Sequence, residues 1–381
     1  MKKFFYILLL ICGLSACIGQ SENGGSLDWT LFRGDEQLSG YTRTALPEKP
    51  SLLWTYQAKS RTVSSPVVLN GVTYWCDRRG KVFGVDLKGE QVFYYDMKTL
   101  VEATPMIRDS ILYIGTIEGK LRAVSLSRQD TLWSFETLGQ ISASPNHVNF
   151  AGNDAVVFGS YDNFLYCVDE RDGHLLSQFE SGYYLNGAVA LWDKFVIFGG
   201  CDQWVRVINC ETGLQTDSLQ LENYIPCSPA ISGDFAYVGD YSGNIYELQM
   251  KGDRIINHRK LVEATDDDGD NVSVPAIDEK RIYVNTSGRY LSSIDRKSGE
   301  VKWRQMLKGN VGESSPVICK DKVIVCTKTG IVSIFDKDNG TPLWEYDTGE
   351  DIVASPAIVK DHFLILTTRG TLLCFGAEGS V

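Results

Sequence analysis

Residues 314–349 read SSPVICKDKVIVCTKTGIVSIFDKDNGTPLWEYDTG, which is one complete copy of a unit that recurs along the chain. The unit opens on Ser315-Pro316, continues through two apolar strands, and reaches a tight turn at Thr329-Gly330. A third strand ends in the turn Asp336–Gly340, and Trp344 then opens a fourth strand. Four short strands in about 40 residues are typical of one blade of a β-propeller.

The start of the unit recurs at a regular spacing. Successive starts lie about 40 residues apart, except for one interval of about twice that length. The starts that carry Pro are Ser65-Pro66, Thr104-Pro105, Ser144-Pro145, Ser228-Pro229, Val274-Pro275, Ser315-Pro316 and Ser355-Pro356. The double interval contains one further unit without Pro, at Gly187-Ala188, so the sequence predicts eight units.

The last unit ends at Phe375 after only three strands, because Ala377 to Val381 is too short and too polar to form a fourth. An upstream segment, Leu52–Tyr56, aligns with the fourth strand that Trp344 opens. Pairing of this segment with the last unit would close the ring and remove an exposed sheet edge.

We therefore expect an all-β fold over residues 29–381, an eight-bladed β-propeller of four-stranded antiparallel blades that is closed by an N-terminal strand. The tryptophans that open fourth strands are expected to be structural, and they are Trp54, Trp133, Trp303 and Trp344. A linear β-solenoid is the alternative fold, and it leaves Trp54 unexplained.

The N-terminus, MKKFFYILLLICGLSAC, has the layout of a secretory signal, with Lys2 and Lys3 followed by an apolar stretch that is too short to span a bilayer. Its end, Leu14–Cys17, resembles the bacterial lipobox, in which the Cys thiol carries the lipid. We predict a signal peptide at residues 1–16, lipid attachment at Cys17 and a flexible tether at residues 17–28. The alternative is an ordinary signal peptide with a chance Cys. Ile18 in place of Asp points to the outer membrane by the enterobacterial sorting rule.

Charge and motif content exclude several classes of function. The chain has 48 acidic and 37 basic residues, a net charge of −11, whereas a nucleic-acid partner requires clustered Lys and Arg. The sequence contains no Cys-x-x-Cys metal knuckle, no Gly-x-Ser-x-Gly elbow and no phosphate-binding Gly-x-x-x-x-Gly-Lys loop. We therefore expect no catalytic residues and no nucleic-acid partner.

One acidic cluster could bind a cation. Asp266, Asp268 and Asp270 place carboxylates at alternate positions beside Gly269, and hard cations such as Ca²⁺ take several carboxylate ligands. No Glu follows at the spacing of an EF-hand, so a solvated acidic turn is the alternative. We expect no cofactor other than this candidate Ca²⁺.

The turn Asp-x-x-x-Gly followed by Trp resembles the repeat of the pyrroloquinoline-quinone-like propellers, and Trp29–Gly34 with Gly40 is similar to the lead-in segment of that family. The resemblance covers about 350 residues. One branch, the quinoprotein dehydrogenases, binds the quinone above a disulfide between adjacent Cys residues. This chain has no adjacent Cys pair and no haem-attachment motif, so the resemblance does not imply a bound quinone.

A second branch, the BamB family of outer-membrane assembly lipoproteins, is a closer resemblance, because it shares the lipobox and the eight blades. Ser218–Glu222 resembles the segment by which that family contacts the barrel-inserting protein, and Asp268-Gly269-Asp270 resembles a second contact element. The resemblance thus implies partner-binding roles for Leu219, Leu221, Asp268 and Asp270. Glu222 stands where the family has a basic residue, and the alternative is that Leu219 and Leu221 are core positions of a strand.

The resulting hypothesis is a non-enzymatic scaffold, lipid-anchored in the outer membrane on its periplasmic face, that binds the barrel-inserting protein of the assembly machinery. The first alternative is an outward-facing propeller that binds a ligand or glycan, with Trp75, Trp192 and Trp204 as stacking platforms. A quinoprotein oxidoreductase is the second alternative.

Overall fold

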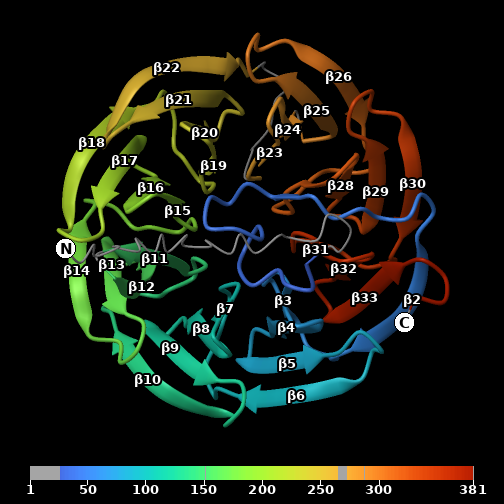
Figure 1. The fold of residues 1–381 in the computed structure, drawn as a ribbon, viewed down its shortest axis with the longest axis horizontal. Helices are drawn as coiled ribbons and strands as arrows, with labels where there is room; N and C mark the ends of the chain where they lie inside the picture. The colour runs from blue at the N-terminus through green and yellow to red at the C-terminus, as the bar shows by residue number, and fades with distance from the viewer. Residues whose placement is uncertain (1–25, 151, 265–272, 287, 381) are drawn as a thin grey trace, which may run out of the picture.

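The computed structural model describes residues 26–380 except 151, 265–272 and 287. In these residues every regular element is a β-strand, and no helix is long and apolar enough to cross a membrane. The strands form eight sheets around a central axis (Figure 1). Each sheet has four strands in antiparallel order, and one sheet carries an additional short parallel strand, β1 (Tyr41–Thr42). The prediction of an eight-bladed β-propeller is confirmed.

Within each blade the first strand lies nearest the axis and the fourth lies at the rim (Figure 1). Blades 1 to 4 contain β3 (Val67–Leu69), β4 (Val72–Cys76), β5 (Lys81–Val85) and β6 (Gln91–Asp96); β7 (Met106–Arg108), β8 (Ile111–Gly115), β9 (Lys120–Ser125) and β10 (Asp130–Glu136); β11 (Asn146–Phe150), β12 (Asn153–Gly159), β13 (Phe164–Asp169) and β14 (Leu175–Glu180); β15 (Ala190–Trp192), β16 (Phe195–Gly199), β17 (Trp204–Asn209) and β18 (Leu214–Gln220).

The remaining blades follow the same order. Blades 5 to 8 contain β19 (Ala230–Ser232), β20 (Phe235–Gly239), β21 (Ile245–Lys251) and β22 (Arg254–Val262); β23 (Ala276–Ile277), β24 (Arg281–Thr286), β25 (Tyr290–Asp295) and β26 (Val301–Met306); β27 (Val317–Cys319), β28 (Lys322–Cys326), β29 (Ile331–Asp336) and β30 (Pro342–Asp347); β31 (Ala357–Val359), β32 (His362–Leu366), β33 (Thr371–Gly376) and β2 (Ser51–Gln57).

The ring is closed by the N-terminal strand, as the sequence predicts. Strand β2 pairs antiparallel with β33, with Ser51 opposite Gly376 and Gln57 opposite Thr371. Figure 1 shows β2 at the rim beside the C-terminal blade. Closure supplies the fourth strand of blade 8 and covers the edge of β33, which would otherwise be open to pairing with other chains.

The core lies between adjacent blades. Second and third strands are mostly buried, and second strands are largely apolar, as in β28, where all five residues are buried and four are apolar. Fourth strands alternate between exposed and less exposed residues, as in β30, because only one of their faces contacts a neighbouring blade. The eight cysteines from Cys76 to Cys374 are free thiols, and all except Cys201 are buried.

The antiparallel blades give the propeller two distinct faces. One face carries the loops that join successive blades and the turns between second and third strands, and we call it the crossover face. For example, the backbone N–H of Leu221, in the loop after β18, donates to the carbonyl of Gln203 in a turn of this face (2.8 Å). The opposite face carries the turns between first and second strands and between third and fourth strands, and we call it the hairpin face.

Three of the four predicted structural tryptophans connect one blade to the next. The indole N–H donates to a backbone carbonyl in the third-to-fourth turn of the following blade, from Trp54 to Leu87 (2.6 Å), from Trp133 to Glu170 (3.1 Å) and from Trp303 to Lys337 (2.9 Å). The Gly that ends each of these turns lies against the indole ring. A Cβ on Gly340 would lie 2.6 Å from Trp303, and its φ of 75° also favours Gly. The repeat therefore pairs Trp with Asp-x-x-x-Gly because the two meet across a blade interface.

Trp344 makes a different contact. It lies on β30 of blade 7 and faces blade 8, whose fourth strand is β2 and which therefore has no third-to-fourth turn. Its ring packs edge-on against Phe363 and Phe375, with centroid distances of 5.8 and 5.3 Å. This position therefore contributes apolar contact at the blade 7 interface.

At four blade interfaces, the Ser or Thr before Pro connects neighbouring blades near the axis. Its hydroxyl oxygen accepts a hydrogen bond from the backbone N–H at the same repeat position of the preceding blade. The pairs are Ser65 N to Thr104 Oγ1 (2.8 Å), Val274 N to Ser315 Oγ (2.9 Å), Ser315 N to Ser355 Oγ (3.1 Å) and Ser355 N to Ser65 Oγ (2.9 Å). The last pair joins blade 8 to blade 1, so these hydroxyls also help to close the ring.

An N-terminal segment, residues 26–42, crosses the middle of the ring (Figure 1), and we call it the strap. Its backbone carbonyls accept hydrogen bonds at the first strand of every blade, from the N–H groups of Lys360, Val68, Ile107, Leu191, Ile231, Ile277 and Ile318 and from the side-chain amide of Asn146. The Asp28 carboxylate and the Leu27 carbonyl bind Asn70 and Gly71 in a first-to-second turn, so the strap lies on the hairpin face. Ser26 to Asp28, which fall in the predicted tether, thus already contact the propeller.

Candidate functional site

Exposed apolar side chains gather on the crossover face. Leu100, Leu138, Tyr183 and Tyr224 are all exposed, and Leu138 is 99% exposed. They lie in four consecutive inter-blade loops, which lead into blades 2, 3, 4 and 5. Large apolar side chains in neighbouring surface loops are typical of a protein-binding surface. We call Leu100, Leu138, Tyr183, Tyr184 and Tyr224 the apolar arc.

The loop that carries Leu138 is held by hydrogen bonds on both sides of this residue. The N–H of Leu138 donates to the Asp162 carboxylate (2.9 Å), and the Thr137 hydroxyl donates to the carbonyl of Gly139 (2.7 Å). A Cβ on Gly139 would lie 2.3 Å from the backbone N of Asp162, so only Gly allows this close approach. Leu138 is thus presented to solvent by an ordered loop, which lowers the entropy cost of binding a partner.

Stacked tyrosines form the centre of the apolar arc. Tyr184 stacks on Tyr161 with a centroid distance of 4.8 Å and an interplanar angle of 8°, and Tyr183 lies against Tyr184 at 4.5 Å. Electrostatic interaction with Cys201 and with Tyr183 raises the pKa of Tyr184 to about 12, so the Tyr184 hydroxyl stays neutral at physiological pH. Rigid, neutral aromatic rings with a hydroxyl group are common anchors at protein interfaces.

The loop positions equivalent to Leu100 and Tyr224 differ in side-chain chemistry around the crossover face. In six inter-blade loops, the carbonyl of one equivalent residue accepts a hydrogen bond from the second-to-third turn of the following blade. These residues are Arg61, Leu100, Gln140, Tyr224, Asn310 and Asp351. Leu100 and Tyr224 lie in the loops into blades 2 and 5, and the polar members Arg61, Gln140, Asn310 and Asp351 lie in the loops into blades 1, 3, 7 and 8. The backbone hydrogen bond thus recurs in these six loops, whereas the side chain at the same position changes.

The structure places the predicted partner-binding leucines in or near the core. Leu219 is a partly buried residue of β18 that packs against the core, and Leu221 is buried. Leu221 occupies the first position of its loop, and the equivalent residues Met97 and Leu307 are also buried. Burial at this position is therefore a feature of the repeat, as in the alternative interpretation of Leu219 and Leu221 as core residues. A contact of these leucines with a partner stays a prediction.

The exposed residues of this loop are Glu222 and Tyr224, which sequence reasoning did not select as contacts. Glu222 forms an ion pair with Lys260 (2.7 Å) at the surface. The other predicted partner and Ca²⁺ residues, Asp266, Asp268 and Asp270, lie outside the described residues, as does Cys17.

The tryptophans proposed as stacking platforms do not form a common surface. Trp75 is completely buried and stacks on Phe83 with a centroid distance of 5.2 Å, so the prediction that Trp75 is a platform is wrong. The strand β4 that carries Trp75 is a second strand, which contacts neighbouring blades on both faces. Trp192 and Trp204 are partly exposed, but they lie at opposite ends of blade 4 strands, on the hairpin face and the crossover face.

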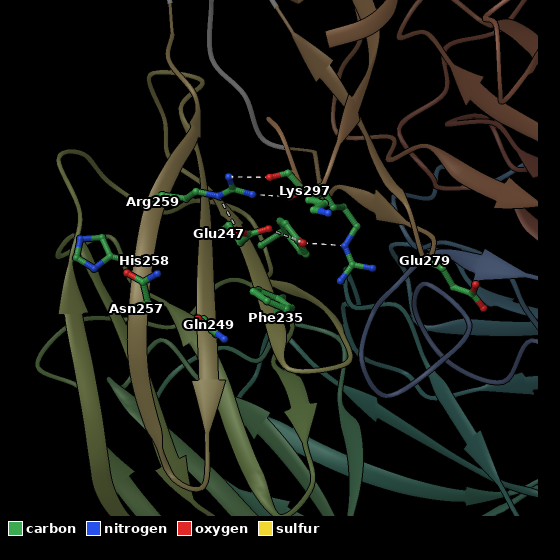
Figure 2. A pocket seen from close by; sticks show the side chains of 10 residues that line it. Phe235, Glu247, Gln249, Asn257, His258, Arg259, Glu279 and Lys297 are labelled. Carbon is green, nitrogen blue, oxygen red and sulfur yellow. Dashed lines mark hydrogen bonds and ion pairs between the residues drawn. The ribbon is translucent and has the colours of Figure 1, made fainter. Parts of the chain in front are cut away.

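A cavity of about 460 Å³ lies between blades 5 and 6 on the hairpin face (Figure 2). Its charged side chains already bind one another. Arg259 donates to Glu247 (2.8 Å), and Tyr237 donates to the same carboxylate (2.8 Å). Arg296 stacks on the Tyr237 ring at 5.3 Å and donates to its hydroxyl oxygen (2.8 Å). This network connects the two blades through two arginines, one carboxylate and Tyr237.

Comparison with known proteins gives a consistent family assignment. The sequence profile of the family described as "Outer membrane protein assembly factor BamB" matches residues 42–198 and 268–381. The outer membrane protein assembly factor BamB of Shewanella oneidensis is 22% identical over 281 residues, which is 68% of this chain and 67% of that protein.

Solved structures show the same fold. The crystal structure of BamB from Moraxella catarrhalis has a TM-score of 0.73 at 16% identity and covers 87% of this chain and 99% of that chain. A europium-containing methanol dehydrogenase has a TM-score of 0.75 at 11% identity and covers 92% of this chain and 98% of that chain. At these identities the likeness shows the propeller fold alone, because one fold carries unrelated activities.

Proposed function

The chain belongs to the family of the outer membrane protein assembly factor BamB, and from this premise we propose that it is a non-enzymatic scaffold of outer-membrane protein assembly. In this proposal the chain is anchored by a lipid at Cys17, on the periplasmic face of the outer membrane, and binds the barrel-inserting protein of the assembly machinery. The relatives are named as outer membrane protein assembly factors, which supports a role in that assembly. The signal-like N-terminus supports a location in the cell envelope.

The observation that carries the proposal is the apolar arc on the crossover face. Four consecutive loops expose large apolar residues. At the loop position of Leu100 and Tyr224, the loops into blades 7 and 8 carry the polar Asn310 and Asp351. Burying an apolar surface gains roughly 25 cal/mol per Å², and aromatic side chains dominate the energy of most protein interfaces. The proposed partner therefore contacts the sector of blades 2 to 5, with Leu138 and Tyr224 as anchors.

Charged residues at the edge of this sector have a secondary role in the proposal. Glu222 and Lys260 form a solvent-exposed pair beside the arc, and such pairs contribute little to stability in water. Rim charges mainly change the association rate and its salt dependence. Because Glu222 and Lys260 neutralise one another, in this proposal they affect the association rate and do not select the charge of the partner.

A capture experiment with matched variants tests the proposal. The full chain and its partners are crosslinked in intact envelopes, purified through the chain, and identified by mass spectrometry. Truncation of an interface anchor costs about 2 kcal/mol, so the double variant Leu138→Ser with Tyr224→Ser should reduce recovery of the barrel-inserting protein at least tenfold. Asn310→Ser is the control, because Asn310 is equivalent to Tyr224 in the polar sector.

Thermal melts of the three proteins must agree, since both tyrosine and leucine lie at the surface. Undiminished recovery with the double variant would remove the apolar arc from the interface. Failure of the wild-type chain to capture any assembly protein, together with binding to glycans, would instead establish the ligand-binding alternative.

A further inference from the structure

One blade departs from the repeat at the central residue of its first, innermost strand. The central residue of the first strand is aliphatic in seven blades, namely Val68, Ile107, Leu191, Ile231, Ile277, Ile318 and Ile358. In blade 3 this residue is His147, in β11, which pairs with Val156 in the same register. Placing a polar ring at a buried position lowers stability unless the ring has partners, and such departures from a local rule are expected at functional sites.

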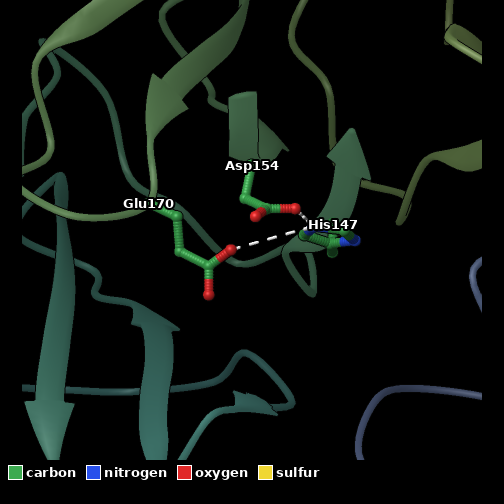
Figure 3. Close-up of side chains that lie close together, drawn as sticks. All are labelled: His147, Asp154 and Glu170. Carbon is green, nitrogen blue, oxygen red and sulfur yellow. Dashed lines mark hydrogen bonds and ion pairs between the residues drawn. The ribbon is translucent and has the colours of Figure 1, made fainter. Parts of the chain in front are cut away.

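Two carboxylates converge on this histidine (Figure 3). Nε2 of His147 lies 3.0 Å from Oδ1 of Asp154 and 3.7 Å from Oε2 of Glu170. Asp154 comes from β12 and Glu170 from the turn after β13, so all three residues belong to blade 3. Both distances are shorter than twice a zinc–ligand bond of about 2.1 Å, so one ion could contact the three groups with little movement.

The side chain of Glu170 is buried and oriented toward the histidine. It is only 8% exposed, and its Oε2 atom is buried and accepts no hydrogen bond. The other oxygen, Oε1, accepts from the hydroxyl of Tyr113 (3.1 Å), and Oδ1 of Asp154 accepts from the side-chain amide of Asn149 (2.9 Å). These donors fix the orientation of both carboxylates, as outer-shell hydrogen bonds do around metal ligands.

Arg108 from blade 2 is the cation now nearest the cluster. Its Nε lies 3.2 Å from Oε2 of Glu170, and its Nη2 lies 3.2 Å from Oδ1 of Asp154. The Arg108 side chain is 35% exposed and can withdraw into solvent. The cavity beside the cluster has a volume of about 220 Å³, and its charged lining residues are Asp109, Asp154, Glu170 and Arg171, three acids and one base.

We propose that His147, Asp154 and Glu170 bind a divalent cation of the zinc class through Nε2 and the two carboxylates. A borderline cation such as Zn²⁺ takes imidazole and carboxylate ligands, whereas Ca²⁺ and Mg²⁺ take oxygen ligands. The ion replaces the proton that His147 shares with Asp154 and displaces the Arg108 guanidinium. Asp154 and Glu170 also line the 220 Å³ cavity, from which water could reach the ion. This site is independent of the apolar arc, which lies on the opposite face.

Zinc titration of the purified full chain tests the site. The chain is stripped with a chelator, and Zn²⁺ affinity is measured by competition with a chromophoric chelator, while Co²⁺ is added separately to read visible absorption. We expect one ion per chain. His147→Ile, which restores the residue type of the other blades, should abolish binding and leave the melting temperature unchanged or higher. Glu170→Gln should weaken binding at least tenfold by removing one charged ligand.

Two further variants test whether Arg108 competes with the ion and whether Zn²⁺ binds at another histidine. Arg108→Gln removes the competing cation and should raise the Zn²⁺ affinity by about tenfold. His174→Gln is the matched control, because His174 also lies beside carboxylates, with Nδ1 2.7 Å from Oδ1 of Asp172, but in an exposed turn. Stoichiometric Zn²⁺ binding by the His147→Ile protein, or no binding by the wild type and by Arg108→Gln, would overturn the proposal.

Discussion

Arg33 is a charged residue whose side chain is almost completely buried in the propeller. It lies in the strap, is 1% exposed, and donates to the carbonyls of Pro275 (2.8 Å) and Pro316 (2.5 Å) near the axis. Burial lowers its pKa, an effect that the charge of Asp35 opposes. A Cβ on Gly40 would lie 2.1 Å from the Arg33 guanidinium, which explains why Gly40 belongs to the lead-in motif.

Substitution of Arg33 should therefore lower the free energy of unfolding of the whole propeller. Arg33→Met keeps the length of the side chain but leaves both carbonyls without a donor and Asp35 without its neighbouring charge. Unsatisfied buried groups of this kind cost about 3 kcal/mol in the free energy of unfolding. Arg79→Met, at an exposed arginine of the crossover face, is the control. Equal urea midpoints for the two variants would show that Arg33 does not hold the strap.

At the scale of the strand and turn, the pairing of Trp with Gly across each interface can be tested with two matched glycines. Gly340 and Gly349 both have positive φ, 75° and 70°, so Ala strains the backbone equally at both positions. Only at Gly340 would the new Cβ meet the ring of Trp303, whereas nothing lies within 4 Å at Gly349. Gly340→Ala should therefore lower the free energy of unfolding by about 1–3 kcal/mol more than Gly349→Ala.

Chemical denaturation of both variants measures this difference. Trp303 fluorescence should also change only in Gly340→Ala, because the contact between the turn and the indole is lost there. Similar stabilities for the two proteins would mean that the turn does not support the ring, and that the repeat motif has another cause.

Much of the element order could be predicted from the sequence, because each blade is encoded by a local pattern. The last unit lacks a fourth strand and Trp54 aligns with Trp344, and these two observations together predict that β2 closes the ring with β33. The strap was not predicted as an element, since its hydrogen bonds reach eight blades and leave no periodic pattern in residues 26–42.

The candidate sites were less predictable for a different reason. The resemblance to known partner segments selected Leu221, although the equivalent Met97 and Leu307 indicate a buried position. His147 could have been found by aligning the first strands, because it replaces an aliphatic residue, but its partners Asp154 and Glu170 become neighbours only through the fold. Exposure of Leu138 likewise depends on the loop conformation, which no pattern in the sequence specifies.

On the scale of the whole molecule, we propose a different role for each face of the ring. The strap covers the axis on the hairpin face, and the chain enters the propeller there at Ser26. The apolar arc lies on the opposite, crossover face. If a lipid is attached at Cys17 as proposed, fewer than ten residues separate it from Ser26, so the hairpin face would lie near the membrane and the crossover face would be accessible to a partner.

The most direct test of this account is photocrosslinking in living cells with a photoreactive amino acid at one position of the full chain. A probe at Leu138, on the crossover face, should give an adduct with the barrel-inserting protein of the assembly machinery. A probe at Lys194, in an exposed turn of the hairpin face, should give none. An adduct at Lys194 without one at Leu138, or no adduct with an assembly protein from either position, would contradict the proposal that this propeller is an assembly scaffold acting through its crossover face.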